Sequence, residues 1–332
     1  MKRLVTIIIV NYNKPQYTID CLRSLTNQTY KNFEVILVDN GSEYNLFLKL
    51  KKELEYYKKS IEIILIRNKL NLFFAGGNNK AIKIANGEYI CLLNNDTIVS
   101  PDFIERMVDF LEPNSNVGMI SPKIKGYKTK NYLWNAGAEI NFRSANISRI
   151  RGLWEYDPNN QKYNEISLTD YAVGTALFVK KEVIDKIGLL DEIFFMYFEE
   201  TEWNFRSKKI GYKNYYVPTT IVYHKVSPNI SKKSLLLKQF FLTRNAQILV
   251  WKHAKFLDLM IFYLKFSFRN LRIILVSLMN REFYVAYLRL SSLLQGFRIG
   301  IKKRSNRSCR KILIKDYYFI IKNQKRIQLL KI

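Results

Sequence analysis

The chain has 332 residues, a formal net charge of +26 at pH 7 and 48% hydrophobic residues. This length fits one large domain or two unequal ones, and the apolar content is enough for a buried core, which excludes a disordered protein. Residues 225–332 hold 24 Lys and Arg against three acidic residues, whereas residues 1–224 hold 30 against 25. The pattern predicts a near-neutral domain followed by a basic one, whose partner is nucleic acid or an anionic membrane.

The first 125 residues alternate short β-rich runs with segments of helical period. The pattern predicts strands over residues 4–10, 33–38, 61–66 and 88–93. It predicts a helix from Pro15, a charged helix ending near Tyr57, a helix over residues 75–85 and another from Pro101. Alternating strands and helices of this length indicate a mostly parallel, Rossmann-like sheet flanked by helices.

Polar residues stand where three of these strands end. Asn11 and Tyr12 follow the first strand, Asp39 ends the second, and Asn94–Asp96 follow the fourth. Ligands of parallel sheets bind outside the carboxyl ends of the strands, so one crevice is expected to collect these residues. A nucleotide needs an aromatic surface for its base, a carboxylate or amide for base and ribose, and a cation for its phosphates. Mg²⁺ or Mn²⁺ binds with few protein carboxylates when substrate phosphates complete the shell.

The second part of the chain is less regular until its carboxyl-terminal third. Residues 126–168 are polar and predict a long loop. They are followed by a strand over 171–179, helices over 182–187 and 199–209, and short strands over 215–217 and 220–223. From residue 235 the pattern is helical. Residues 256–279 are heavily apolar but interrupted by Lys265, Arg269 and Arg272, which favours a helix lying in a membrane interface over one that crosses it.

Nine segments carry recognisable motifs: 5–13, 37–42, 74–79, 93–97, 174–176, 188–192, 194–202, 217–218 and 222–224. In this order and spacing, within residues 3–255, they resemble the family-2 glycosyltransferases. They look most like the rhamnosyltransferase-type branch that builds cell-surface polysaccharides. The resemblance implies a GT-A fold and transfer of a sugar from a nucleotide-diphosphate donor, with inversion, to a lipid-linked or polysaccharide acceptor.

The resemblance also implies roles for individual residues. Tyr12 stacks on the base, and Asp39 binds base or ribose. Asp96 is the ligand of Mg²⁺ or Mn²⁺ in a D-x-D-like element, and His224 is expected to contact the same metal or the diphosphate. The remaining donor-binding positions are Asn11, Gly76, Gly77, Asn78, Asn94 and Asn95, and Asn94 stands where the first Asp of the element often stands.

The acidic segment Glu199–Glu202 resembles the family's E-D-x-D motif, whose Asp is the general base. By position that role falls to Glu200, which would take the proton of the acceptor hydroxyl. Both expected Asp positions are Glu here, and since Glu reaches one methylene further, Glu202 and Glu199 remain alternatives. An acidic first helical turn, favoured by the helix dipole, is the competing structural interpretation.

These observations predict a catalytic domain over residues 1–235, divided into a donor-binding half (1–125) and an acceptor-binding half (126–235). A basic, helical, membrane-associating region over 236–332 follows. Three dispersed cysteines indicate a reducing compartment, and the apolar run at 5–10 is too short for a signal peptide. We therefore expect a cytoplasmic protein, peripheral on the inner face of the cell membrane.

Two other functions are compatible with parts of the sequence. The basic carboxyl-terminal region alone would permit nucleic-acid binding, but zinc-finger spacing and the RNP-type aromatic signature are missing from the sequence, so no nucleic-acid partner is expected. A nucleotidyltransferase could share a similar sheet. The glycine-rich opening with Arg or Lys that such an enzyme carries after its first strand is missing here.

Overall fold

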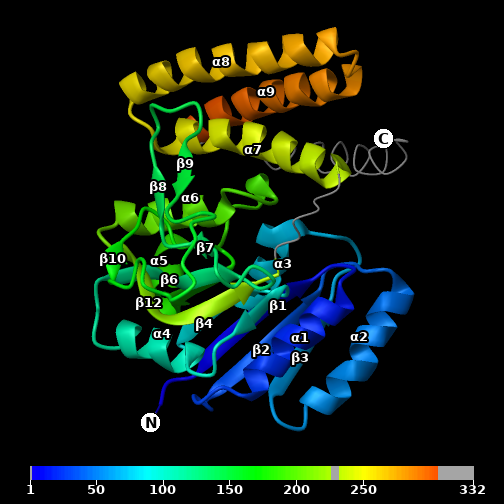
Figure 1. Cartoon of the computed structure of the whole chain (residues 1–332), viewed down its shortest axis with the longest axis vertical. Coiled ribbons are helices and arrows are strands. Elements are labelled where there is room, and N and C mark those ends of the chain that lie inside the picture. The colour runs from blue at the N-terminus through cyan, green and yellow to red at the C-terminus, as the bar shows by residue number, and fades with distance from the viewer. Residues whose placement is uncertain (1, 226–231, 306–332) are drawn as a thin grey trace. The chain divides into compact units, whose positions relative to one another are not determined.

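A computed structural model describes residues 2–225 and 232–305 of the chain. The chain folds as two compact units (Figure 1). The first unit comprises residues 1–139, 150–191 and 199–226, and the second comprises 140–149, 192–198 and 227–332. Two short internal segments of the amino-terminal two thirds therefore belong to the same unit as the carboxyl-terminal helices.

The first unit is built on one central sheet with the strand order β10-β12-β6-β11-β4-β1-β2-β3. Four strands are mutually parallel: β4 (Tyr89–Asn94), β1 (Val5–Asn11), β2 (Phe33–Asp39) and β3 (Glu62–Arg67). Beyond β4 the sheet is mixed: β11 (Ala176–Lys180) runs antiparallel to β4 and β6 (Val117–Gly126), and β12 (Lys213–His224) runs parallel to β6. The parallel half agrees with the βα pattern of the sequence, whereas the other half is more mixed than that pattern predicts.

Helices cover both faces of this sheet, and the alternation of side chains in β11 shows which helix lies on which face. Leu177 and Val179 join an apolar cluster that includes residues of α3 (Phe73–Ile82), α5 (Lys181–Ile187) and α6 (Glu199–Lys209). Phe178 points the other way, onto Phe103 of α4 (Phe103–Leu111), with ring centroids 5.3 Å apart. Gln28, just after α1 (Pro15–Thr26), accepts a hydrogen bond from the Ile104 backbone N–H of α4 at 3.0 Å. α1 in turn packs on α2 (Tyr44–Tyr57).

Two sequence expectations differ from the structure in this unit. The two short strands expected around Pro218 are one strand, β12, with a register shift between Val217 and Ile221. Proline has no N–H to donate to a ladder, and an irregularity at this point lets the strand continue past it. The expected loop over 126–168 contains short strands: β7 (Leu133–Asn135), β8 (Ala138–Ile140), β9 (Ser148–Ile150) and β10 (Ser167–Leu168). β5 (Thr97–Val99) also forms, directly after the polar end of β4.

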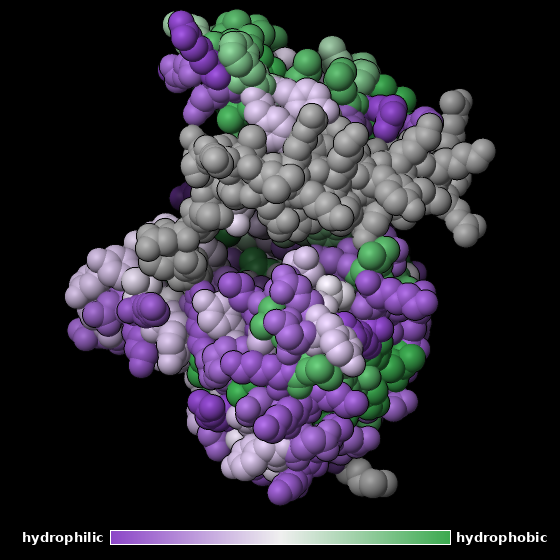
Figure 2. Space-filling model, turned by 90° about the vertical axis from the view of Figure 1, so that its right-hand side faces the viewer, coloured by the Kyte–Doolittle hydropathy of each residue, from purple (hydrophilic) through white to green (hydrophobic). Residues whose placement is uncertain are grey.

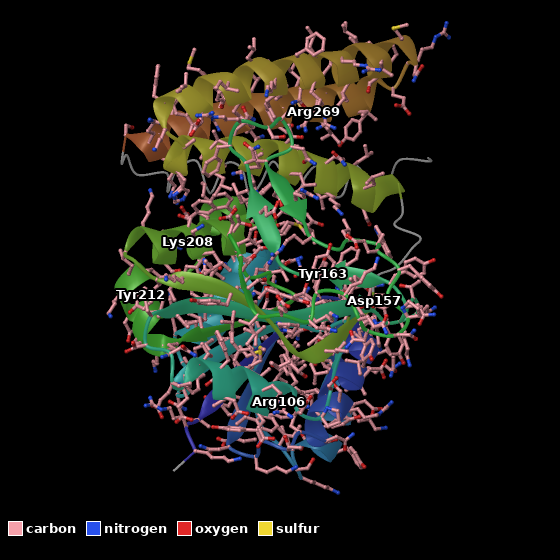
Figure 3. The ribbon with its side chains drawn as sticks, turned by 60° about the vertical axis from the view of Figure 1, so that its left-hand side comes forward. Arg106, Asp157, Tyr163, Lys208, Tyr212 and Arg269 are labelled. Carbon is pink, nitrogen blue, oxygen red and sulfur yellow. The ribbon has the colours of Figure 1, made fainter. Side chains whose placement is uncertain are left out.

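A buried ammonium group organises part of that irregular region. Lys123 of β6 is fully buried, and its Nζ donates to Asn160 Oδ1 at 2.9 Å, to Asn164 Oδ1 at 2.6 Å and to the Lys162 carbonyl. Asp157 Oδ2 lies 3.5 Å from the same nitrogen. Figure 3 labels Asp157 and Tyr163 of this loop. Burial lowers the pKa of Lys123, and the Asp157 carboxylate opposes that effect. The loop therefore folds around a side-chain cation much as other loops fold around a metal ion.

The second unit contains three α-helices within the described residues: α7 (Lys232–His253), α8 (Phe256–Met279) and α9 (Phe283–Arg304). Its apolar core joins residues of these helices, such as Phe262 and Phe266, to Ile147 and Phe194 from the two internal segments. α9 packs closely against α7 at Gly300. A Cβ at that position would stand only 2.1 Å from Trp251 Cδ1. No helix in the described ranges is long and apolar enough to cross a bilayer.

We predict that Gly87→Ala lowers the free energy of unfolding by roughly 1–3 kcal/mol, since the new Cβ has no room. Gly87 precedes β4, and a Cβ there would lie 2.5 Å from the backbone nitrogen of Thr6 in β1. Urea unfolding measures the change. The control is Lys80→Ala on the exposed side of α3, which should shift stability by less than about 0.5 kcal/mol. Equal stability of the two variants would contradict this account of the β1–β4 packing.

Candidate active site at the strand ends

The parallel register brings the ends of three strands together. Asn11 of β1 lies beside Asp39 of β2, and Val10 lies beside Asn94 of β4. The Asn11 amide donates to Asp39 Oδ1 at 3.1 Å and to Ser42 Oγ at 3.2 Å. The residues that the sequence predicted at one crevice therefore do lie at one edge of the sheet, and two of them are joined by a hydrogen bond.

Asp39 is fully buried, and its carboxylate is bound by groups of the protein itself. Besides Asn11, it accepts from the Ser42 backbone N–H at 3.3 Å and lies 3.5 Å from Arg67 Nε. The Arg67 guanidinium is stacked 4.1 Å from the centroid of the Phe47 ring. Asp39 therefore holds Arg67 at the end of β3, and the more exposed group of this pair is the arginine. Tyr12, by contrast, is 37% exposed and available for stacking.

Asn94 and Asn95 lie at the same edge, but their contacts differ. The Asn94 backbone N–H donates to the Thr175 carbonyl at 3.0 Å, and its side chain is half-buried. Asn95 turns inward, and its amide donates to Thr18 Oγ1 at 3.1 Å and to Asn11 Oδ1 at 3.4 Å. Asn95 therefore links the turn after β4 to the polar cluster at Asn11.

Asp96 and His224, which are distant in sequence, lie in contact. His224 Nε2 is 3.1 Å from Asp96 Oδ1, and both side chains are largely buried. The antiparallel pairing of His224 with Thr97 sets this geometry, and the Lys225 backbone N–H donates to the Asp96 carbonyl at 2.7 Å. The edge of the His224 ring faces Trp134, with centroids 5.4 Å apart. The structure thus brings together the two residues predicted to bind the metal.

This donor set suits a divalent cation. Asp96 Oδ1 and His224 Nε2 lie 3.1 Å apart, so a carboxylate oxygen and an imidazole nitrogen are near enough to ligate one ion, and His224 Nδ1 is buried without a hydrogen-bond partner in the described residues. Mg²⁺ strongly prefers oxygen ligands, whereas an imidazole is readily accepted by the later divalent metals and by Mn²⁺ in mixed sites. Within the described residues no group of three or more His, Cys, Asp or Glu side chains is arranged to hold a metal. The remaining positions around a cation would belong to substrate oxygens and water.

Gly76, Gly77 and Asn78 lie inside the fold near the start of α3. A Cβ on Gly77 would stand 3.0 Å from Val10 Cγ1, and the buried Asn78 amide donates to the Phe74 carbonyl at 2.9 Å. These residues bring α3 close against β1, next to the polar strand ends. Their direct contact with a nucleotide-sugar donor stays a prediction, because none of these three residues presents an exposed polar side chain.

The three glutamates at the start of α6 have different surroundings. Glu202 is buried and paired with Arg206, whose Nε lies 2.9 Å from its carboxylate, and Arg206 Nη2 also donates to the Leu189 carbonyl at 2.6 Å. Glu202 therefore anchors α6 to the preceding turn. Glu199 and Glu200 each have one buried carboxylate oxygen without a hydrogen-bond partner in the described residues.

Burial raises the pKa of both of these carboxyl groups, but to different extents. The pKa of Glu199 lies well above its usual value, because burial and the nearby Glu200 both disfavour its ionised form. The pKa of Glu200 is also raised by burial, but the backbone N–H groups of Thr201 and Gly174 oppose this rise. Backbone N–H groups thus favour the ionised form of Glu200, and Glu200 faces Gly174, the neighbour of the Thr175 that binds Asn94.

The sequence pattern did not indicate two charged residues that lie near this edge. Arg67 ends β3, and its only sequence signal was a basic residue at the end of a predicted strand. Lys225 follows His224, and its Nζ lies 2.5 Å from Asp20 Oδ2 and 5.1 Å from the centre of the Tyr127 ring. An Asp20–Lys225 pair 205 residues apart could not be read from the sequence, because only the tertiary fold brings α1 to the end of β12.

Comparisons with known proteins agree with this architecture. The family model described as glycosyl transferase family 2 matches residues 6–188. The chain is 28% identical over 192 residues to an uncharacterised glycosyltransferase of Methanocaldococcus jannaschii, an alignment that covers 56% of this chain and 59% of that protein. It is 27% identical over 212 residues to the low-salt glycan biosynthesis hexosyltransferase Agl10 of Haloferax volcanii, covering 62% of each. The aligned part thus spans about three fifths of each relative.

Solved structures share the fold at low sequence identity. A Pyrobaculum calidifontis mannosyltransferase in complex with GDP-Man and Mn²⁺ superposes with a TM-score of 0.58 at 14% identity, covering 92% of this chain and 87% of that one. Residues 1–349 of Staphylococcus aureus TarS superpose with a TM-score of 0.55 at 14% identity, covering 92% of both chains. These likenesses confirm the predicted GT-A fold with its helical carboxyl-terminal part. Since the family model covers more than half of the chain, including the strand ends that carry Asn11, Asp39 and Asp96, the protein belongs to glycosyl transferase family 2.

Proposed function

We propose that this protein is an inverting, metal-assisted glycosyltransferase that moves a sugar from a nucleotide-diphosphate donor to a hydroxyl of a growing cell-surface glycan. The observation that carries this proposal is the contact between Asp96 and His224 at the polar strand ends. Glu200 is linked to the same edge through Gly174 and Thr175. A cation-binding pair and a carboxylate base at one edge of the sheet are the two groups that this reaction requires.

The donor is proposed to bind along the ends of β1, β2 and β4. Tyr12 offers an exposed ring for the base, and Arg67, held by Asp39, offers a cationic edge beside it. Relatives and structural neighbours support this class of ligand, since one neighbour was solved with GDP-Man and Mn²⁺ and another, TarS, with UDP. The motif set resembles rhamnosyltransferases, so a nucleotide-diphosphate rhamnose is the first donor to test.

In the proposed reaction the Glu200 carboxylate removes the proton from the acceptor hydroxyl as the acceptor oxygen attacks the anomeric carbon. A new carbon–oxygen bond forms on one face of the sugar while the bond to the diphosphate breaks on the other, which inverts the configuration. Asp96 and His224 would hold a Mn²⁺ or Mg²⁺ ion, which neutralises charge on the departing diphosphate. Glu202, committed to Arg206, keeps α6 in place, and burial together with the Glu200 charge disfavours the ionised form that Glu199 would need as the base.

We also propose that the helical unit holds the protein at an anionic membrane surface, facing a lipid-linked acceptor on the cytoplasmic side. Two stripes of large apolar side chains point into solvent. On α8 the exposed residues are Met260, Leu264, Phe268, Leu271, Leu275 and Leu278; on α9 they are Phe283, Tyr287, Leu290, Leu294, Phe297 and Ile301. The spacing of three and four residues puts each set on one helical face. Green, hydrophobic surface gathers at the top of Figure 2, where α8 and α9 lie in Figure 1.

The surroundings of these stripes match an anionic bilayer. Residues 232–305 contain two acidic side chains, Asp258 and Glu282, and the first is paired with Arg143 at 2.6 Å. An apolar face that enters the interface supplies affinity, and basic residues bias the binding toward anionic lipid by about 1 kcal/mol each.

Asp96→Asn is expected to abolish transfer, because a neutral amide is a poor partner for a divalent cation. His224→Ala should weaken Mn²⁺ activation and raise the metal concentration needed for half-maximal rate. Donor turnover over a panel of nucleotide sugars, with Mn²⁺ titrated, measures both effects. Asp109→Asn on the exposed side of α4 is the control and should behave as wild type. If Asp96→Asn retained wild-type turnover in the presence of a chelator, the metal assignment would be wrong.

Glu200→Gln should lower kcat by about 100-fold or more while nucleotide binding is retained. The same variant should be more stable than wild type at pH values above the pKa that a glutamate has in the unfolded chain. A carboxyl group whose pKa is raised in the folded state favours folding when protonated, and this contribution is lost as pH rises through the raised pKa. Gln removes that loss, so the gain in Tm should grow with pH.

Matched variants separate the three glutamates. Glu199→Gln should keep most of the activity, because Glu200 is the proposed base and the surroundings of Glu199 disfavour its ionised form. Glu202→Gln should lose stability, because it leaves the Arg206 guanidinium without its carboxylate. If Glu202→Gln were stable and inactive while Glu200→Gln stayed active, the base would be Glu202.

Replacing two stripe residues, Leu264→Ser and Phe268→Ser, is expected to reduce flotation with anionic vesicles at low salt and also at high salt. Both side chains are about three-quarters exposed, at 76% and 75%, so their loss should leave the fold intact. Charge attraction is screened within about 8 Å at physiological salt, whereas an inserted apolar face persists. Failure of the wild type to float with any vesicle would overturn the membrane proposal and leave the helical unit as a packing or partner-binding domain.

A further inference from the structure

Four aromatic side chains gather on two neighbouring segments of the irregular region that follows β6. Trp134 lies in β7 and Tyr132 directly precedes it, whereas Trp154 and Tyr156 lie on the segment that runs alongside. The Trp134 and Trp154 rings meet edge to face with centroids 5.3 Å apart. The Tyr132 and Tyr156 rings meet in the same way, also at 5.3 Å. These four residues are called the aromatic platform below.

The platform is a single, largely exposed surface. Tyr132 and Trp134 lie on the same face of their strand, because side chains alternate along a strand and Leu133 between them is fully buried. Trp154 is 47% exposed and Tyr156 is 54% exposed. The indole N–H and hydroxyl groups of the four rings form no hydrogen bond with any residue that the structure describes. The platform therefore combines exposed ring surface with polar edges that no described protein group binds.

The backbone at Trp154 has an unusual conformation. Its φ is +61°, in the left-handed region that L-residues with large side chains rarely adopt. The Trp154 N–H donates to the Leu133 carbonyl at 2.9 Å, and the Glu155 N–H donates to the Gly152 carbonyl at 3.0 Å, which together hold the turn. Because the Trp154 ring is about half exposed, burial in a core does not explain why the fold keeps this residue there. Strained residues of this kind concentrate at ligand sites.

The platform begins at the metal-binding pair. Gly126, at the end of β6, is paired with His224 of β12, and its N–H donates to the Tyr132 carbonyl at 3.1 Å. The Trp134 ring then contacts the His224 ring, with centroids 5.4 Å apart. In the sheet, β6 and β12 lie on one side of β4, and β1 and β2, which carry the proposed base-binding residues, lie on the other (Figure 1). The platform thus adjoins the metal pair on the side away from the proposed base site.

From this arrangement we infer that the aromatic platform binds a pyranose ring of the acceptor, which is therefore a saccharide. The face of an aromatic ring is negative and attracts the C–H groups on the apolar face of a pyranose. The N–H and O–H groups at the ring edges are placed to bond with sugar hydroxyls. Trp and Tyr supply both kinds of contact. The inference rests on the proposed sugar transfer and adds to it the chemical class and the place of the acceptor.

A hydrocarbon chain or a nucleotide base fits the platform less well. A hydrocarbon chain would leave the four polar ring edges without partners, whereas a saccharide carries hydroxyls around its whole rim. A base of the donor would have to lie across the metal pair from Tyr12, the exposed ring at the end of β1. The test below includes a probe for each of these alternatives.

Binding is tested on the full-length protein labelled with 5-fluorotryptophan, by fluorine NMR. The probes are the methyl glycosides of rhamnose, glucose, galactose, mannose and N-acetylglucosamine. We expect at least one of them to shift the signals of Trp134 and Trp154 in a saturable way. The signals of Trp203, which is fully buried, and of Trp251, which packs on Tyr263, should stay in place. Single Trp→Phe variants assign the four signals.

A matched pair of substitutions tests the contribution of the platform to binding. Tyr156→Ala removes one exposed ring of the platform, and we expect it to weaken glycoside binding roughly tenfold. The control is Tyr56→Ala on α2, where the ring is 71% exposed, and this variant should bind as the wild type does. Circular dichroism and Tm check that both variants fold. The wild-type titration needs no substitution, so it decides the question even if a variant is unstable.

Four results would overturn the inference. The first is that no methyl glycoside shifts Trp134 or Trp154. The second is an equal shift with cyclohexanol at the same concentration, which would show that the rings accept any apolar group. The third is a shift with UDP or GDP alone, which would assign the platform to the base of the donor. The fourth is equal weakening by Tyr156→Ala and Tyr56→Ala, which would exclude a localised site.

A kinetic measurement separates this inference from the proposed function. With the glycoside that binds as acceptor, Tyr156→Ala should raise the acceptor KM roughly tenfold, and Tyr56→Ala should leave it unchanged. If the wild type hydrolysed a nucleotide sugar but transferred nothing to the bound glycoside, the acceptor role would be wrong. If it neither hydrolysed nor transferred any nucleotide sugar, the proposed function would fail, whereas saccharide binding by the platform would still be decided by the titration.

Discussion

The amide of Asn11 is the junction on which the polar edge of the sheet depends. It donates to Asp39 and Ser42 on the side of β2, and its oxygen accepts from Thr18 of α1 at 3.0 Å and from Asn95 after β4. One buried side chain thus ties together two strand ends, the first helix and the turn that carries Asp96. A buried amide needs all of its hydrogen bonds satisfied, so this network fixes the relative positions of its members.

The metal-binding pair depends on a second constraint, the pairing of β12 with β5. β5 is only three residues long, and it directly follows the turn at Asn94–Asp96. Pairing of Thr97 with His224 brings the imidazole to the carboxylate, and the Lys225 N–H fixes the Asp96 backbone. β12 continues past Pro218 because its pairing with β6 shifts register between Val217 and Ile221. The same strand therefore carries His224 to its place beside Thr97. The proposed chemistry therefore depends on an irregularity in the sheet.

The two units use positive charge in different ways. In the first unit, buried cations are neutralised by the protein: Lys123 by Asp157 and a ring of carbonyl and amide oxygens, and Lys225 by Asp20. In the second, the partners of Arg269 and Arg289 within the described residues are neutral or aromatic groups. The first arrangement stabilises loops and strand ends.

The sequence by itself determined the parallel half of the sheet. The strands β1 to β4 alternate with helices, and the spacing of apolar residues distinguishes the two kinds of element. It also determined that Asn11, Asp39 and Asn94–Asp96 share one edge, since parallel strands end on the same side. It did not predict β6, whose Pro122 and Gly118 weaken the local strand pattern, or the short strands of residues 126–168. Only the tertiary structure decided that Glu202 is occupied by Arg206, that Asp39 holds Arg67, and that Asp20 pairs with Lys225. Those facts depend on contacts between distant segments, and a single sequence records local pattern but not which distant side chains share a dry, low-dielectric site.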